Sequence, residues 1–232
     1  ELTDSNLANL EELEKKTEKN EAEQNNEQMD LYGKPYEFNE DYIRMLLPKK
    51  NVFVVNQSMF RTPLDMIIVS HEPERKFVCK LIENSKLVDS WVKSSDKGFY
   101  SLDYTFWKGG KDRVTRSFNP DFFIKLDLNQ YLLKTGNDND SSKLRKLQNQ
   151  GIKKLILVVE IKGDVEMDKN VVPAKTEAGK EHFDSVNKRL EKENPINFKP
   201  EFRDSVKQHY EFFLLRPEGY SEWFRKLEKG QV

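Results

Sequence analysis

Two carboxylates and a lysine stand where two apolar segments begin and end. Asp121 follows Pro120 and directly precedes FFIKL, while the longer apolar segment LILVVEI contains Glu160 and is followed by Lys162. Side chains alternate between the two faces of a strand, so Glu160 and Lys162 are expected to share one face. A buried charge is costly unless it is paired or binds a metal. These three residues are therefore candidates for a reactive site.

The chemistry that suits these residues is metal-dependent hydrolysis of a phosphodiester. If the two strands are neighbours, Asp121 and Glu160 can hold one hard cation, and the backbone carbonyl of Ile161 can add an oxygen. Mg²⁺ prefers octahedral oxygen ligands and keeps several waters. Lys162 could then reach the attacking water or the charge that develops at phosphorus. Two simpler interpretations stay open: Glu160 and Lys162 as an exposed ion pair, and Asp121 as a turn residue.

The elements that must position these residues alternate along the chain. The segment 152–163 contains a continuous apolar run, which predicts a central strand that is buried on both faces. Residues 127–150 are polar and predict a surface excursion with a short basic helix. We expect an α/β domain with a mixed central sheet flanked by helices, built from strands at 51–55, 86–92, 121–126, 152–163 and 209–216, a hairpin around Gly109 and Gly110, and helices over 72–84, 174–193 and 217–230.

Charge is distributed unevenly over the 232 residues. The net charge is −1, but residues 1–30 hold ten acidic and three basic residues, which leaves 36 basic and 30 acidic residues in the rest. We therefore divide the chain into an acidic helical linker or appendage (1–38) and a mildly basic body (39–232). A basic body suits phosphate groups, although ordinary surface charge would look the same.

The two motifs together resemble the signature of the PD-(D/E)xK nucleases, with Pro120-Asp121 as its first half and Glu160-Ile161-Lys162 as its second. The flanking segments SHEPERKFVCKL, FYSLDYTF, SFNPDFFI, LILVVEIKGD, EAGKEHFDSV and YEFFLL are similar, in this order, to the C-terminal endonuclease domain of type III restriction subunits. The similarity covers roughly 65–216. The Asp121–Glu160 spacing is longer than is usual for that family.

That resemblance implies a restriction-endonuclease-like fold over 39–232 and Mg²⁺-dependent cleavage of double-stranded DNA in bacterial defence. It implies an ATP-dependent motor domain in the same full-length chain, to which the ATP requirement would belong, and a modification (methyltransferase) subunit as partner. The chain begins with Glu1 instead of Met, so we expect it to be part of a longer protein. The single cysteine, Cys79, fits a reducing compartment, and we expect a cytoplasmic location.

Glu74 is a further candidate for the site. It shares a helical stripe with Phe77, Val78 and Leu81, and a carboxylate on an otherwise apolar face is unusual. The resemblance implies a first-helix glutamate beside the metal. The alternative is a glutamate that complements the positive end of its helix.

Basic residues around these motifs are candidates for DNA contact. The resemblance places the helix after the ExK motif at the border of the site, which makes Lys180 and His182 candidates for the scissile phosphate. Arg113 and Arg116, with lysines near the hairpin turn, could follow a DNA backbone, because phosphate contacts give affinity without sequence information. A solvated surface lysine is the ordinary alternative for Lys180.

Other functions remain open at this point. No apolar run approaches the roughly 20 residues of a membrane span, so we expect no membrane partner. A different PD-(D/E)xK nuclease, linked to a helicase or a transposition system, would use the same residues. A non-catalytic module that binds DNA or a partner protein is the alternative from another class.

Overall fold

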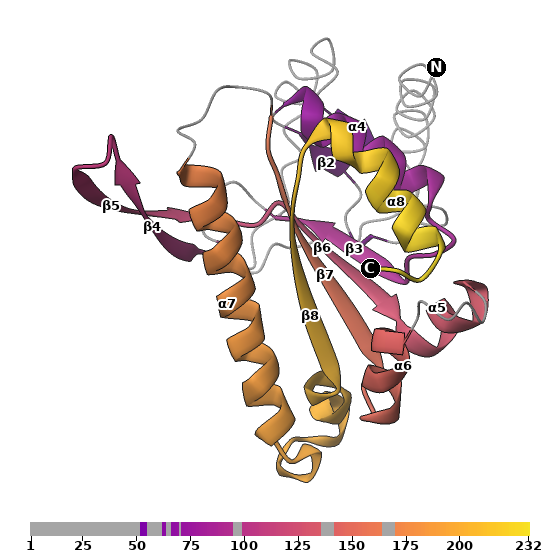
Figure 1. Ribbon diagram of the computed structural model, residues 1–232. Coiled ribbons are helices and arrows are strands. Elements are labelled where there is room, and N and C mark those ends of the chain that lie inside the picture. The colour runs from indigo at the N-terminus through magenta and orange to yellow at the C-terminus, as the bar shows by residue number, and fades with distance from the viewer. Residues whose placement is uncertain are drawn as a thin grey trace, which may run out of the picture. The chain divides into compact units, whose positions relative to one another are not determined.

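The computed structural model describes residues 52–54, 62–63, 66–69, 71–94, 99–135, 142–163 and 170–232 (Figure 1). The chain divides into two compact units, one of residues 1–56 with 64–71 and one of residues 57–63 with 72–232. In the first unit, β1 (Val52–Val54) pairs with β2 (Met66–Ile68) in antiparallel fashion. The strand predicted at 51–55 is therefore present, whereas the proposed appendage 1–38 and its boundary at residue 39 lie outside the described residues.

The second unit is built around a mixed sheet of four strands in the order β3-β6-β7-β8. Strand β6 is antiparallel to both β3 and β7, and β7 is parallel to β8. Seven of the eight residues of β7 are buried, which confirms the predicted central strand. The strands are β3 (Ser90–Lys93), β6 (Phe122–Asp127), β7 (Lys154–Ile161) and β8 (Gln208–Leu215).

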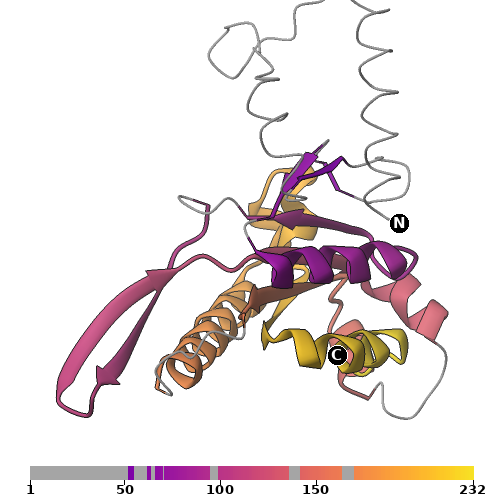
Figure 2. The same ribbon diagram turned by 90° about the horizontal axis from the view of Figure 1, so that it is seen from above.

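Helices cover both faces of this sheet, so the predicted mixed α/β architecture is confirmed (Figures 1 and 2). On one face α4 (Glu72–Glu83) packs beside α8 (Tyr220–Glu228), and the Phe77 ring lies 5.0 Å from that of Phe122. On the other face α7 (Val171–Lys192) places Phe183 6.1 Å from Phe212. The helix predicted from Pro217 begins as a 3₁₀ turn, Pro217–Gly219, and becomes α-helical at Tyr220.

A two-stranded hairpin joins the α7 face and extends away from it (Figure 1). Its strands are β4 (Leu102–Lys108) and β5 (Asp112–Phe118), joined as predicted by Gly109 and Gly110, which have φ values of 58° and 73°. Glycine adopts such values without a Cβ clash. One side of the hairpin is buried in the core under α7, through Leu102, Tyr104, Phe106 and Phe118.

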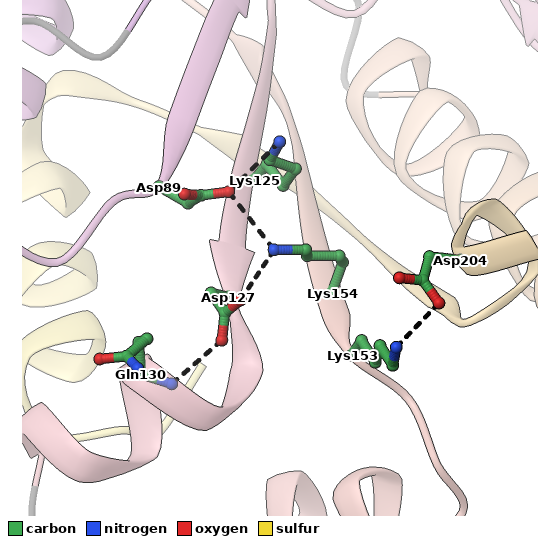
Figure 3. A network of polar contacts seen from close by, with 7 residues as sticks. All are labelled: Asp89, Lys125, Asp127, Gln130, Lys153, Lys154 and Asp204. Atoms are coloured by element: carbon green, nitrogen blue, oxygen red, sulfur yellow. Dashed lines mark hydrogen bonds and ion pairs between the residues drawn. The ribbon is translucent and has the colours of Figure 1, made fainter. Parts of the chain in front are cut away.

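The excursion at 127–150 contains two helices, α5 (Leu128–Thr135) and α6 (Ser142–Asn149). The basic helix α6 was predicted, but α5 was not. Helix α5 forms because Leu128 and Tyr131 are buried and because Asp127 Oδ1 accepts a 3.1 Å hydrogen bond from the Gln130 amide, as an N-cap does. Figure 3 shows that Asp127 also pairs with Lys154 at 2.7 Å, in a network at this end of the sheet.

Candidate active site

The end of the sheet opposite this network holds the residues singled out in the sequence. Phe122 pairs with Val159, so the next residues outward, Asp121 and Glu160, face each other across the β6–β7 ladder. The Ile161 amide donates a 2.6 Å hydrogen bond to Asp121 Oδ2. The two strands are therefore neighbours, as the metal-site hypothesis required.

Glu160 is buried, with 3% of its surface exposed, and it lies on the α7 face. Its Oε1 atom accepts from Lys175 Nζ at 2.7 Å and lies 3.0 Å from Lys162 Nζ. Lys162 thus shares the face of Glu160, as alternation predicted. The other oxygen, Oε2, is buried and has no hydrogen-bond partner among the described residues. This arrangement is unlike the exposed ion pair that was the simpler interpretation.

Lys175 belongs to the site, and the sequence interpretation missed it. It lies on α7, with 6% of its surface exposed, and its ammonium group sits 4.6 Å from the Phe118 ring and 5.5 Å from the Tyr104 ring. The predicted stripe of this helix began at Phe183. Continuing it backwards in steps of four reaches Gly179 and then Lys175, and this spacing could have identified the residue.

Glu74 lies near this site but is paired on the other face of the sheet. It is buried on α4, and its Oε2 lies 3.4 Å from Nζ of Lys93, which is also buried. Lys93 was not anticipated from the sequence. The negative charge of Glu74 is still close enough to act on the Asp121 carboxyl group. Its contribution to a metal site stays a prediction.

The carboxyl group of Asp121 is unusually hard to ionise. Burial, followed by the charge of Glu160, raises its pKa to about 8, and the hydrogen bond from Ile161 only partly offsets this. The pKa values of the two lysines around Glu160 are shifted in opposite directions. Burial lowers the pKa of Lys175, whereas for Lys162 burial is outweighed by the charges of Glu160 and Asp121 together with its hydrogen bonds, and its pKa is raised.

The residues present fit a cation that takes oxygen ligands. No three His, Cys, Asp or Glu side chains gather into a metal-binding group in the part of the chain that the structure describes. Two carboxylates do meet here, however. Asp121 resists ionisation beside Glu160, and Glu160 Oε2 is buried without a partner in the part of the chain that the structure describes. A divalent cation would compensate both, because it favours the ionised acid and supplies a partner for the oxygen. Coordination by the Ile161 carbonyl stays a prediction.

The predicted DNA contacts fall on two elements. Lys180 is exposed on α7, one position beyond Gly179. His182 is half-buried on the same helix, where its Nε2 atom lies 2.7 Å from the Tyr100 hydroxyl, and burial lowers its pKa. Arg113 and Arg116 are both exposed on β5, but an odd separation places them on opposite faces of the hairpin. These roles stay predictions.

Arg113 lies opposite Trp107 on the outer face of the hairpin, and the Trp107 side chain is 56% exposed there. Arg116 is on the inner face, with its guanidinium carbon 5.6 Å from the Phe106 ring. One DNA backbone along one face would therefore meet only one of the two arginines. The helices described in the structure include none that is long and apolar enough to cross a membrane.

Comparison with known proteins gives no family assignment: no protein-family model, no curated protein and no solved structure matches the chain. Functional conclusions therefore rest on the residues and their geometry.

Proposed function

We propose that the second unit is a Mg²⁺-dependent DNA endonuclease domain that hydrolyses phosphodiester bonds at the end of its sheet that carries Asp121 and Glu160. The observation that carries this proposal is the buried Oε2 of Glu160, which has no hydrogen-bond partner among the described residues and belongs to a side chain across the ladder from Asp121 and next to Lys162. Two acids and a lysine at the ends of two paired strands match the PD-(D/E)xK arrangement, and the mixed sheet with helices on both faces suits a restriction-endonuclease-like fold.

Asp121 and Glu160 would hold the Mg²⁺, which supplies Lewis-acid polarisation of the phosphate and a more acidic water when bound. The chain's own groups then complete the reaction. Lys162 is at the rim of the site, with 17% of its side chain exposed, and can turn towards a phosphate. Its ammonium group would stabilise the negative charge that develops as water attacks phosphorus. The bond from phosphorus to the 3′ oxygen breaks, giving a 5′-phosphate and a 3′-hydroxyl group that takes up a proton.

The motifs and flanking segments that resemble type III restriction subunits suggest a biological setting. We propose a cleavage domain of a type III-like restriction subunit in the cytoplasm, delivered to double-stranded DNA by an ATP-dependent motor in the same full-length chain. A modification subunit would supply sequence specificity. Another helicase-linked PD-(D/E)xK nuclease would use the same groups, and the neighbouring domain would distinguish the two.

Nicking of supercoiled plasmid DNA tests the reaction. The chain is used in excess over plasmid with Mn²⁺ at low salt, because phosphate contacts by a few basic residues are strongly salt-dependent. We expect slow, unspecific nicking that Glu160→Ala and Lys162→Ala each reduce at least ~10³-fold. Lys229→Ala, an exposed change beyond α8, is the matched control and should nick normally. Absence of nicking by the wild type, or equal nicking by all variants, contradicts the proposal.

A further inference from the structure

A third residue continues the row formed by Asp121 and Glu160. Lys93 of β3 pairs with Phe122 of β6, so Ser94, one residue further, lies opposite Asp121. The Ser94 amide donates a 2.8 Å hydrogen bond to the Asp121 carbonyl, which extends the ladder by one residue. Residues directly opposite one another share a face of the sheet. Ser94, Asp121 and Glu160 therefore stand side by side at the ends of three adjacent strands, on the α7 face.

The Ser94 hydroxyl is buried and unpaired. The residue is 5% exposed, and its Oγ atom has no hydrogen-bond partner among the described residues. A buried hydroxyl normally has a partner, because leaving one unpaired costs its full desolvation penalty. Only three buried side-chain polar atoms are unpartnered in the described part of the chain, and two of them, Ser94 Oγ and Glu160 Oε2, lie in this one row on either side of Asp121.

On the α7 face, the positive charges lie on the opposite side of the row from Ser94, while the ammonium group of Lys93, next to Ser94 on β3, lies on the α4 face and pairs with Glu74. Lys162 and Lys175 come from the end of β7 and from α7, and both contact Oε1 of Glu160. Ser94 comes from β3, on the far side of Asp121 from β7. On the α7 face, the side of Asp121 next to β3 therefore offers the neutral oxygen of Ser94, while the charge of Lys93 on the other face is paired with Glu74.

From this row we infer that the Ser94 hydroxyl is a third protein oxygen for the divalent cation at the Asp121–Glu160 site. The inference rests on the proposed function and adds a ligand to it. A hydroxyl is a hard, neutral oxygen donor of the kind that binds Mg²⁺ in phosphate-binding loops. It would add an oxygen ligand on the α7 face without adding another buried negative charge beside Asp121 and Glu160.

Binding of Mn²⁺ to the intact chain, followed by isothermal titration calorimetry, tests the role of the hydroxyl. We expect Ser94→Ala to weaken Mn²⁺ binding by about tenfold or more, on the scale seen when a group supporting a metal site is removed. Ser90→Ala is the matched control, because Ser90 lies on the same face of the same strand but at its other end, opposite Lys125. It should bind Mn²⁺ like the wild type.

Stability without metal separates this role from a structural one. Because Ser94 Oγ makes no hydrogen bond to any described residue, metal-free Ser94→Ala should resist urea at least as well as the wild type. Lower stability with unchanged Mn²⁺ affinity would show that the hydroxyl serves packing only, and would overturn the inference.

A thiol at the same position tests direct ligation. In a Cys79→Ser background, so that the only thiol is at position 94, Ser94→Cys should lose Mn²⁺ affinity and gain Zn²⁺ affinity, because sulfur ligands favour the softer metal. An unchanged Zn²⁺-to-Mn²⁺ preference overturns the inference while leaving the proposed function intact. Failure of the wild type to bind Mn²⁺ at all would instead overturn the proposed function, and this inference with it.

Discussion

The backbone amide of Ile161 donates a 2.6 Å hydrogen bond to Oδ2 of Asp121. Asp121 directly precedes β6 and Ile161 ends β7, so this side-chain contact extends the hydrogen bonding between the two strands. This bond fixes the carboxyl group next to Glu160. It leaves Asp121 buried beside another acid, which raises its pKa to about 8. The two neighbouring acids therefore interact unfavourably, and a bound divalent cation would relieve this repulsion.

Stability should depend on pH through Asp121. The unfolded chain releases this proton near the ordinary pKa of 3.8, whereas the folded chain retains it up to about pH 8. The folded state binds more protons than the unfolded state in this interval. The contribution of Asp121 to the free energy of unfolding therefore falls as pH rises from about 4 to 8. Asp121→Asn removes the titration and retains an acceptor for the Ile161 amide. Urea unfolding in EDTA should show a difference in the free energy of unfolding between variant and wild type that grows with pH. A difference that is the same at every pH would contradict the raised pKa of Asp121.

Lys175 should matter for stability as well as for the site. Lys175→Ala removes one of two ammonium groups from buried Glu160, and we expect a loss of about 2–4 kcal/mol in the free energy of unfolding. Lys180→Ala, an exposed change on the same helix, is the control and should cost less than about 0.5 kcal/mol. Chemical denaturation measures both.

A double-mutant cycle checks that the loss comes from the ion pair. Glu160→Gln combined with Lys175→Met should cost clearly less than the sum of the two single changes, because the double variant leaves neither charge buried alone. If the losses in the free energy of unfolding were additive, Lys175 would stabilise the fold by packing on Phe118 and Tyr104 and not by pairing with Glu160.

The sequence predicted the sheet better than the site. Apolar runs and turn residues located β6, β7, β8, the hairpin and α7, because these elements bury continuous or periodic apolar faces. Asp121, Glu160 and Lys162 could be brought together from strand ends and alternation alone. Helix α5 was missed because the segment 127–150 is polar as a whole, and the helix depends on a cap and on two buried residues.

Lys93 and Lys175 were missed for a different reason. Lysine ordinarily marks a solvated position, and only tertiary contacts show that these two compensate Glu74 and Glu160. The pairing of Glu74 with a lysine on the other face of the sheet likewise depends on how α4 packs against β3. Sequence periodicity specifies the buried stripe of α4, but it does not identify Lys93 as the residue that pairs with Glu74.

Asp127, at the other end of β6, should show the opposite dependence on pH. Its hydrogen bond with Lys154 lowers its pKa, so its contribution to stability is present at neutral pH and is lost as pH falls through the lowered value (Figure 3). Both side chains are about a third exposed, so Asp127→Asn should cost at most about 1 kcal/mol at pH 7. In acid titration of unfolding, the difference from wild type should vanish once the pH lies below the lowered pKa of Asp127. A difference that persists there would mean that Asn fails to cap α5.

Gly179 is required for close packing of α7 on the sheet. A Cβ atom at this position would lie 2.5 Å from the ring of Phe212, which is itself buried against Phe183. Gly179→Ala should therefore destabilise by about 1–3 kcal/mol, despite the better helix propensity of alanine. Glu177→Ala, exposed on the same helix, is the control. A higher unfolding temperature for Gly179→Ala than for the wild type would mean that the Phe212 ring moves aside freely.

The central claim is that Asp121 and Glu160 share one divalent cation, and calorimetric titration with Mn²⁺ tests it most directly. The wild type should bind Mn²⁺, more tightly at pH 8 than at pH 6, because binding requires ionised Asp121. Asp121→Asn and Glu160→Gln should each abolish the binding heat, while Glu211→Gln, an acid in β8 paired with Lys143 and His209, should retain it. Mn²⁺ binding that survives in both site variants, or a wild type that binds none, would contradict the account.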